Sequence, residues 1–494
     1  MTVSFNSIPS DLKVPLFYAE VDNSQANSAT GSLLRLIVGQ VNDDAAADDV
    51  GKLTLVSSLS MAKSIGGVGS MLAEMYDTWR RSDPAGEIWC LPIKAEGTEA
   101  TGKVTISGTT TVGGQINLYV AGQRVRTTVA SGATATVAAA ALAVAVNAAG
   151  LSVSAVAAAG EVTLTCRWPG LSGNDIQLQL NRQGRANGEI TPAGMTVTVT
   201  AMAGGVGTPD VAAALAQIGD EPFEFICAPW ADATSLDAWK AFMDDSSGRW
   251  SWSRQLYGHV YSAARGTLGE LVALGDTRND PHVTVFGFEK ACPDPVWRQV
   301  AAYAARQAVF ISADPARPTQ TGELVSITPA PSGEGFMLTE RQSLLSHGIA
   351  TAYSSSGTQR IERAITSYQK NNLGQADNSY LDSETLHQSA YIIRFLKTRI
   401  TSKYGRHKLA NDGTRFGAGQ AIVTPAVIRA ELIAGYYILE QMGIVENADA
   451  FAQYLVVERS LTDPTRINVL YPPDLVNQLR VFALQYQFRL QYQV

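Results

Sequence analysis

The end of the chain, VFALQYQFRLQYQV at residues 481–494, alternates without a break between apolar and polar side chains. A period of two is the pattern of a β-strand with one buried and one solvent-facing side. Ordinary strands run to about 5–6 residues, so this one is unusually long, and no hairpin partner follows it. The apolar positions are Phe482, Leu484, Tyr486, Phe488, Leu490, Tyr492 and Val494.

This terminal strand has two possible partners. It either completes a sheet of its own domain or adds to a sheet in a neighbouring subunit, and a division is also open, with 481–486 at home and 487–494 in the neighbour. Burying its apolar side chains contributes on the order of 10 kcal/mol, and ordering the strand costs a comparable amount. One such arm therefore binds weakly, whereas arms repeated through a lattice bind strongly through effective concentration.

Bulk properties exclude several classes of protein. A chain of 494 residues exceeds a single core, and 46% hydrophobic and 17% charged residues are typical of a soluble globular protein. A formal charge of -7 argues against a general nucleic-acid binder and a basic membrane-surface protein. We find neither an apolar run of about 18 residues, as a membrane span needs, nor a signal peptide. The four cysteines are widely spaced, which favours buried free thiols in a cytosolic fold.

Short apolar strands alternate with helical stretches in two parts of the chain, which indicates an α/β layer with a mostly parallel sheet. These strands lie at 33–41, 87–94, 223–230, 255–263 and 282–288.

The segment between the two α/β parts has a different composition. Residues 98–205 are rich in Thr, Val, Ala and Gly, and are predicted to form short strands with glycine turns and one Ala-rich helix at about 134–149. Insertion of such a unit at a loop is tolerated when the loop ends lie close together. The fold prediction is an α+β multidomain protein with an N-terminal extended arm (1–30), a discontinuous α/β middle domain (31–97 and 206–345), an inserted β-rich outer domain (98–205), an inner α+β C-terminal domain (346–480) and a C-terminal linker strand (481–494).

The N-terminal segment is predicted to be a second arm. Its strand-like run KVPLFYAEVD is flanked by polar stretches, and Pro9 and Pro15 oppose a place in a central strand. Its anchors are expected to be Leu16, Phe17 and Tyr18.

A search for catalytic chemistry finds no motif. The segment GGVGSM at 66–71 lacks the third glycine of a dinucleotide fingerprint and falls between two predicted helices. Phosphate-loop, zinc-protease and nucleophile-elbow motifs are absent from the sequence. We therefore predict no catalytic, cofactor-binding or metal-binding residues. An α/β enzyme with a β-rich accessory domain stays open as the alternative, because a catalytic triad is assembled in space.

One basic stretch stands out within 394–408, which contains no acidic residue. It is either a helix C-terminus favoured by the macrodipole and running into a basic loop, or a contact surface for an acidic partner. Its cations are Arg394, Lys397, Arg399, Lys403, Arg406 and Lys408.

Four segments, taken together and in order, resemble the Mu-like contractile phage tail sheath proteins. They are FNSIPSDLKVPLFYAEVDNSQA at 5–26, RNDPHVTVFG at 278–287, DPARPTQTGEL at 314–324 and LTDPTRINVLYPPDLVNQLRVFALQYQFRL at 461–490. The resemblance covers most of the chain and is weakest in the inserted segment.

The resemblance implies a structural subunit rather than an enzyme. Such subunits stack as hexameric rings in a helical tube around a tail tube, and contract to drive the tube through the host envelope without a cofactor. Their terminal arms add strands to neighbouring subunits, the C-terminal domain lines the inside, and the inserted domain faces out. The implied partners are further copies of the chain, the tail tube protein, and baseplate and tail terminator proteins, with no direct nucleic-acid or membrane contact. The implied location is the virion tail, assembled in the bacterial host cytoplasm, with part of the basic stretch facing an acidic tube exterior.

Overall fold

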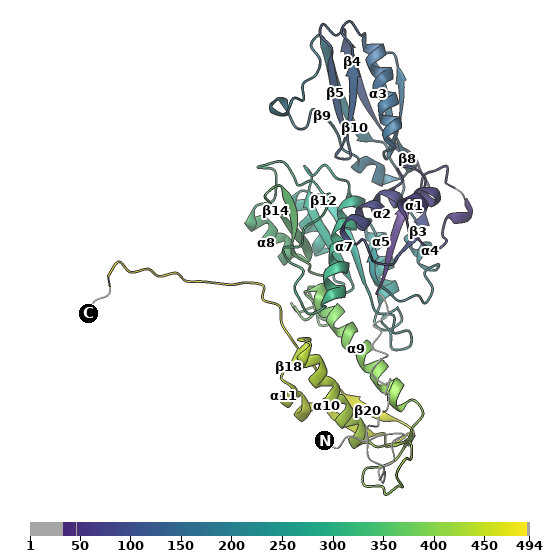
Figure 1. The fold of residues 1–494 in the computed structure, drawn as a ribbon, viewed down its shortest axis with the longest axis vertical. Helices are drawn as coiled ribbons and strands as arrows, with labels where there is room; N and C mark the ends of the chain where they lie inside the picture. The colour runs from purple at the N-terminus through teal and green to yellow at the C-terminus, as the bar shows by residue number, and fades with distance from the viewer. Residues whose placement is uncertain (1–32, 46, 492–494) are drawn as a thin grey trace, which may run out of the picture.

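The computed structural model describes residues 33–45 and 47–491 of the chain. Its elements lie in three tiers, with a β-rich unit above a central sheet and a helical unit below it (Figure 1). An extended C-terminal segment leaves the body sideways, and its described part runs away from the body.

The central tier is an eight-stranded sheet in the order β15-β14-β13-β12-β11-β1-β3-β2. Neighbours from β14 to β3 run parallel, whereas β2 and β15 join the two edges antiparallel. The inner strands are almost entirely buried, as continuous apolar runs require in a sheet covered on both faces. The strands are β1 (Leu34–Gln40), β2 (Thr54–Leu55), β3 (Ile88–Ile93), β11 (Phe223–Cys227), β12 (His259–Gly266), β13 (Val283–Glu289), β14 (Ile349–Ser355) and β15 (Thr358–Arg363).

Helices cover this sheet, and the longest of them is rich in alanine. The small side chains of Ala301, Ala304 and Ala308 are fully buried, which allows α7 to pack closely on α2 and β12. The turn predicted at 66–71 joins α1 to α2, as expected for a helix–helix turn. The helices of this tier are α1 (Leu59–Gly66), α2 (Met71–Ser82), α4 (Val211–Leu215), α5 (Ala233–Met243), α6 (Leu268–Asp276), α7 (Val296–Ala313) and α8 (Leu338–Ser346), with a short 3-10 helix at Ala47–Asp49.

The upper tier leaves and rejoins the central tier at one point. Thr98 and Val206 form an antiparallel bridge, with N–O distances of 3.1 and 3.2 Å, so the two ends of the segment are adjacent. Between them lie a four-stranded sheet (β10-β4-β8-β7), a three-stranded sheet (β6-β5-β9) and one helix. The elements are β4 (Glu99–Gly108), β5 (Gly114–Val120), β6 (Gln123–Val129), α3 (Ala135–Ala149), β7 (Val153–Ala158), β8 (Glu161–Pro169), β9 (Leu178–Leu180) and β10 (Met195–Ala203), with 3-10 helices at Leu171–Asp175 and Arg185–Asn187.

The central sheet extends past the boundary predicted at 345/346, which is therefore wrong. Strands β14 and β15 belong to this sheet, and Ile349, Ala352 and Ile361 are buried in the same core as the other strands. The loop-rich composition of 289–345 resembles a domain end. Local composition does not show which sheet the hairpin after it joins.

The lower tier has a hydrophobic core of its own, built on α9 and α10. The N-terminal half of α9 carries buried residues such as Leu386 and Ala390, while Phe395 and Ile400 pack in the lower core. One unbroken helix therefore connects the two tiers (Figure 1). The elements are α9 (Ser383–Tyr404), β16 (Lys408–Leu409), β17 (Ile422–Val423), α10 (Pro425–Gln441), β18 (Val445–Glu446), α11 (Ala448–Tyr454), β19 (Val456–Arg459), β20 (Ile467–Leu470) and β21 (Asp474–Leu475).

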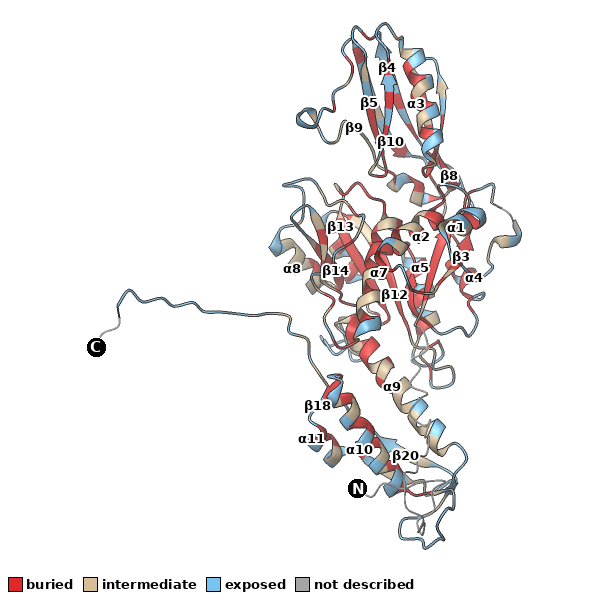
Figure 2. Ribbon diagram, viewed as in Figure 1, coloured by how far each residue is buried: buried red, intermediate tan, exposed pale blue. Residues whose placement is uncertain are grey.

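The predicted fold class is confirmed. The chain is an α+β protein with a layered α/β unit, an inserted β-rich unit and a mixed C-terminal unit. Buried residues concentrate along the central sheet, whereas the C-terminal segment is exposed (Figure 2). The predicted N-terminal anchors, Leu16, Phe17 and Tyr18, lie outside the described residues.

Candidate assembly interfaces

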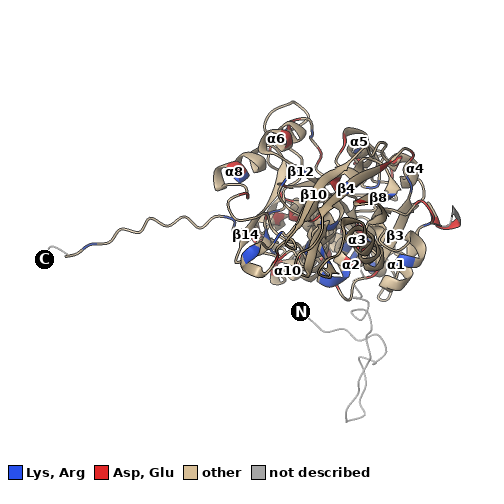
Figure 3. Cartoon of the chain, turned by 90° about the horizontal axis from the view of Figure 1, so that it is seen from above, with Lys and Arg blue, Asp and Glu red and all other residues tan. Residues whose placement is uncertain are grey.

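The C-terminal segment pairs with no strand of its own chain among the described residues. It is extended from Val476 to Gln491 and takes part in no β-ladder. The alternative that places 481–486 in a home sheet is therefore not seen in the isolated subunit, since these residues join no sheet of the described chain. Figure 3 shows the same segment standing away from the body in a second view.

The apolar face of this segment is in solvent. The exposed fractions of Phe482, Leu484, Tyr486 and Phe488 are 68–79%, and that of Leu490 is 96%. Tyr492 and Val494 lie outside the described residues. A row of large apolar side chains on a segment outside any β-ladder is a hazard on a solitary protein. It is the arrangement that strand addition requires in an assembly.

A second open element lies in the lower tier. Strands β19 and β20 form a two-stranded antiparallel sheet in which Val457 and Ile467 face the lower core. On the opposite face, Val456 and Leu470 are 46% and 62% exposed. The outer edges of both strands make no backbone hydrogen bond to the rest of the described chain. Two strands alone form a marginal sheet, so this hairpin is suited to accept a further strand.

The structure divides the predicted basic stretch. Arg394 forms an ion pair with Glu224, while Arg399 and Lys403 both reach Glu431, with Lys403 Nζ 2.9 Å from its Oε1. Burial raises the pKa of Glu431, but the hydrogen bond from Lys403 and the charge of Arg399 more than offset this and lower it.

The other members of the stretch face solvent. Lys397, Arg406 and Lys408 are exposed, and Lys408 Nζ donates to Gln420 Oε1 at 3.3 Å. Among the described residues, none of the three forms an ion pair. A contact with an acidic partner therefore has these three cations available, whereas the paired ones stabilise the fold.

A buried polar cluster that the sequence analysis missed holds α9 against the central sheet. Glu224 of β11 accepts a 2.5 Å hydrogen bond from His387 Nδ1 and a charged one from Arg394, both on α9. The His387 Nε2 atom lies 3.0 Å from the hydroxyl of Tyr261 on β12. The one signal for it in the sequence is an acidic residue inside the apolar run FEFIC, because a charge is kept there only if it is paired.

A separate polar cluster, centred on Asp175, holds the upper tier against the central one. Asp175 forms an ion pair with Arg265, whose Nε lies 2.7 Å from its Oδ1, and accepts a 2.6 Å hydrogen bond from the backbone N–H of Val296. Burial raises the pKa of Asp175 to about 6, against the opposing effect of Arg265. Beside it, the rings of Trp168 and Trp297 meet edge to face with centroids 5.3 Å apart. The inserted unit is therefore fixed by specific contacts beyond its chain connections.

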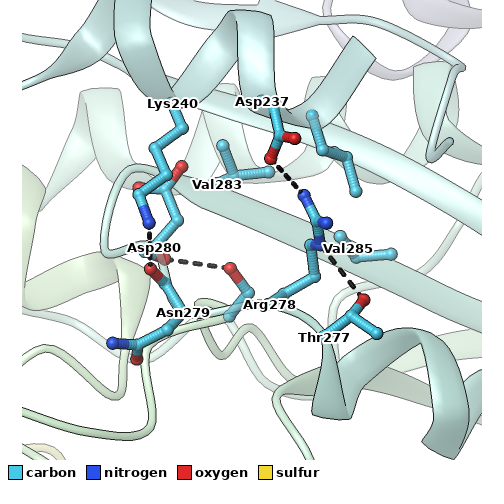
Figure 4. Close-up of a pocket in the computed structure, with 10 residues that line it drawn as sticks. Asp237, Lys240, Thr277, Arg278, Asn279, Asp280, Val283 and Val285 are labelled. Atoms are coloured by element: carbon cyan, nitrogen blue, oxygen red, sulfur yellow. Dashed lines mark hydrogen bonds and ion pairs between the residues drawn. The ribbon is translucent and has the colours of Figure 1, made fainter. Parts of the chain in front are cut away.

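The smaller of two cavities offers little room for chemistry. This cavity, of about 40 Å³, lies between α5 and the loop at 277–280 (Figure 4). It is bordered by the ion pair of Arg278 with Asp237, at 2.7 Å, and by the hydrogen bond from Lys240 to the carbonyl oxygen of Asn279, at 3.1 Å. This volume suits one or two waters and is far below the several hundred Å³ of typical ligand pockets.

A larger open groove of about 690 Å³ lies between α8 and the loop at 366–381. Within 33–45 and 47–491, no group of three or more His, Cys, Asp or Glu side chains is placed to hold a metal ion. In the same part of the chain, no helix is both long and apolar enough to cross a membrane. The four cysteines are free and buried, as expected.

Comparison with known proteins agrees with the segments quoted above. A family model for the phage tail sheath protein central domain matches residues 204–367, and one for the phage tail sheath C-terminal domain matches 375–489. The Mu-like prophage FluMu tail sheath protein of Haemophilus influenzae is 40% identical over 496 residues, which cover 99% of this chain and 100% of that protein.

One solved structure agrees at the level of the fold. The sheath tail protein of Desulfitobacterium hafniense superimposes with a TM-score of 0.50 at 12% identity, covering 94% of this chain and 97% of that one. The helical sheath of the anti-feeding prophage, in its contracted state, gives a TM-score of 0.49 at 10% identity, with 96% and 99% covered. From its family-model matches and its full-length relative, this chain belongs to the Mu-like phage tail sheath proteins, a family of structural proteins.

Proposed function

We propose that this chain is the subunit of a contractile sheath that polymerises as stacked hexameric rings around a tail tube. Its contraction drives the tube through the host envelope. The observation that carries the proposal is the presence of two incomplete elements in one chain, the exposed arm at 481–491 and the open hairpin of β19 and β20. The arm is a strand without a sheet, and the hairpin is a two-stranded sheet with open edges.

The linker strand adds to this hairpin in a neighbouring copy. Residues 481–491 span about 36 Å when extended, at roughly 3.3 Å per residue, which is long enough to leave one subunit and cross a face of the next. Backbone hydrogen bonds then supply affinity, and the alternating apolar side chains set the register. The N-terminal arm, anchored by Leu16, Phe17 and Tyr18, is proposed to be a second link of the same type.

The remaining partners follow from a tube-shaped assembly in a phage tail. We place the lower tier inside, against the tail tube protein, and the inserted tier outside. Baseplate and tail terminator proteins bind the two ends of the sheath. The subunit binds neither nucleic acid nor membrane, and it is assembled in the bacterial host cytoplasm before it resides in the virion.

Electron microscopy of the purified chain separates this function from the alternative α/β enzyme. We expect concentrated protein to form long tubes in negative stain, because open-ended strand addition propagates through a lattice. A small closed oligomer at all concentrations, with no tubes, would contradict the proposal and favour the enzyme.

The tube contact is proposed to involve the exposed cations Lys397, Arg406 and Lys408. Replacing Lys397 and Arg406 together with glutamate should weaken binding of sheath subunits to the tail tube at least ten-fold at low salt. Wild-type binding should weaken as salt rises, because exposed charges are screened. Lys403 is not a suitable test site, since its reversal breaks the ion pair with Glu431.

The matched control reverses two exposed cations elsewhere, Lys52→Glu with Arg185→Glu, for the same change in net charge. Co-sedimentation of purified tubes with each variant over a salt series is the measurement. If the pair at 397 and 406 binds like the control, the tube contact lies outside the basic stretch.

A further inference from the structure

The segment before the linker strand runs back along α9. After β21, the side-chain amide of Gln388 on α9 donates to the carbonyl oxygen of Val476 at 3.4 Å and to that of Ile444 at 2.6 Å. Four residues later, Arg480 meets Glu384, one turn nearer the start of the same helix. Residues 476–480, here called the strap, therefore lie antiparallel to the N-terminal half of α9 and connect the lower tier to the central one.

The strap ends in a buried charge cluster. Arg480, whose side chain is 12% exposed, reaches Asp382 at 3.0 Å and Glu384 at 3.2 Å. Asp382 is also bonded through both oxygens to Arg363 at the end of β15, at 2.8 Å each. Arg480 therefore connects the chain to both the helix start and the edge of the central sheet.

Neighbouring groups complete the attachment. Gln320 donates to the carbonyl oxygen of Leu479 at 3.1 Å, and Glu384 accepts from the hydroxyl of Thr319 at 2.8 Å. One residue further along, Val481 is 78% exposed. Arg480 is therefore the last residue that attaches the strap to the body, because residues 481–488 form no hydrogen bond or ion pair with the rest of the described chain.

We propose that Arg480 is the anchor of the linker strand, which fixes the point at which the arm leaves the subunit and so sets its reach to the neighbouring copy. The proposal rests on the proposed function of the arm. With Arg480 paired, a neighbouring subunit that is displaced pulls through the arm on the junction of the central sheet and α9. Without the anchor, the strap is held only by the hydrogen bonds of Gln388 with Val476 and of Gln320 with Leu479. Once these give way, residues 476–480 add about 16 Å of slack.

The consequence is a weaker and looser lattice. The effective concentration of a tethered strand falls with roughly the three-halves power of tether length once the tether exceeds the span. Lengthening a 14-residue arm by the strap lowers it about 1.5-fold per contact, and this factor is compounded over the contacts that nucleate a tube. Arg480→Gln should therefore raise the critical concentration for tube formation at least two-fold while the tubes still form.

Three variants test the anchor. Arg480→Gln releases the strap, an insertion of five Gly/Ser residues after Arg480 adds the same slack with the anchor intact, and Arg363→Gln removes the other partner of Asp382 without touching the strap. The mobility of a spin label attached at Leu479, whose side chain is exposed, should rise clearly in the monomer of Arg480→Gln and stay near wild type in the other two. The critical concentration should rise in Arg480→Gln and in the insertion variant, and stay near wild type in Arg363→Gln.

Two results would overturn the proposal. One is unchanged mobility of the spin label at Leu479 in Arg480→Gln. The other is an insertion variant that assembles at the wild-type critical concentration, which keeps the test valid even if Arg480→Gln fails to fold. The mobility experiment uses the monomer, so it judges the anchor independently of whether the arm pairs with a neighbour.

Discussion

Replacing Glu224 with glutamine is expected to lower the free energy of unfolding by about 3 kcal/mol. The Glu224 carboxylate is 1% exposed and is paired with both His387 and Arg394. Its replacement removes the counter-charge of the pair and leaves one amide to satisfy two donors. We expect the lower end of the range for broken buried pairs, because Arg394 is 35% exposed and regains some hydration.

The effect should depend on pH. Burial alone raises the pKa of Glu224, but the charges and hydrogen bonds of Arg394 and His387 lower it below the ordinary value of 4.5. A lowered carboxyl pKa contributes stability that is complete above the unfolded pKa and is lost as the pH falls through the folded one. The wild-type advantage over Glu224→Gln should therefore be full at pH 7 and shrink below about pH 4.5.

Urea unfolding of the monomer at several pH values measures this difference. The matched control is Glu431→Gln, whose carboxylate also pairs with two cations but lies wholly within the lower tier. Hydrogen exchange should show α9 loosened from the central sheet in Glu224→Gln only. Equal stability of Glu224→Gln and wild type at pH 7 would mean that packing alone holds α9 in place.

Charging the apolar face of the linker strand is expected to abolish tube formation. Phe488 and Leu490 each contribute about 1.5–3 kcal/mol when buried in a neighbour, so Phe488→Asp with Leu490→Asp should raise the critical concentration at least 100-fold. Deleting residues 487–494 should have the same effect. Both variants should remain soluble monomers, because Phe488 and Leu490 are exposed in the isolated subunit.

The same charges on the opposite face provide the control. Gln487→Asp with Gln491→Asp adds two acidic groups to the same segment and leaves the apolar row intact. This pair should assemble within a few-fold of the wild-type concentration, as measured by sedimentation and negative stain. Normal tubes from the 487–494 deletion would show that the arm is not the link.

Local patterns in the sequence predict much of this fold. Fully apolar runs mark the parallel strands, because a sheet buried on both faces has no polar side. The Ala-rich stretch at 134–149 gives α3, which begins at Ala135. The period of two from Phe482 onward identifies a strand and its apolar face.

Partners chosen in three dimensions could not be predicted. The hairpin of β14 and β15 joins the central sheet because its Ile349 and Ile361 complete that core, and no local signal shows this. Half of the basic stretch serves the fold because Glu224 and Glu431, distant in sequence, lie next to it. The strap depends on Arg480 meeting Asp382, which are 98 residues apart.

Cross-linking within assembled tubes tests the central claim that the linker strand pairs with a neighbouring copy. A single variant carries two new cysteines, one in place of Tyr486 on the arm and one in place of Val456 on the hairpin. A short bifunctional thiol reagent then joins them. The native thiols should not compete, because all four are buried and burial raises the pKa of Cys166, for example, to about 12. We predict a ladder of covalent dimers, trimers and longer chains on a denaturing gel of tubes, and none from the monomer. An intramolecular cross-link in the tubes, seen as a product of monomer mass with no ladder, would show that the strand returns to its own subunit. That result would contradict the account.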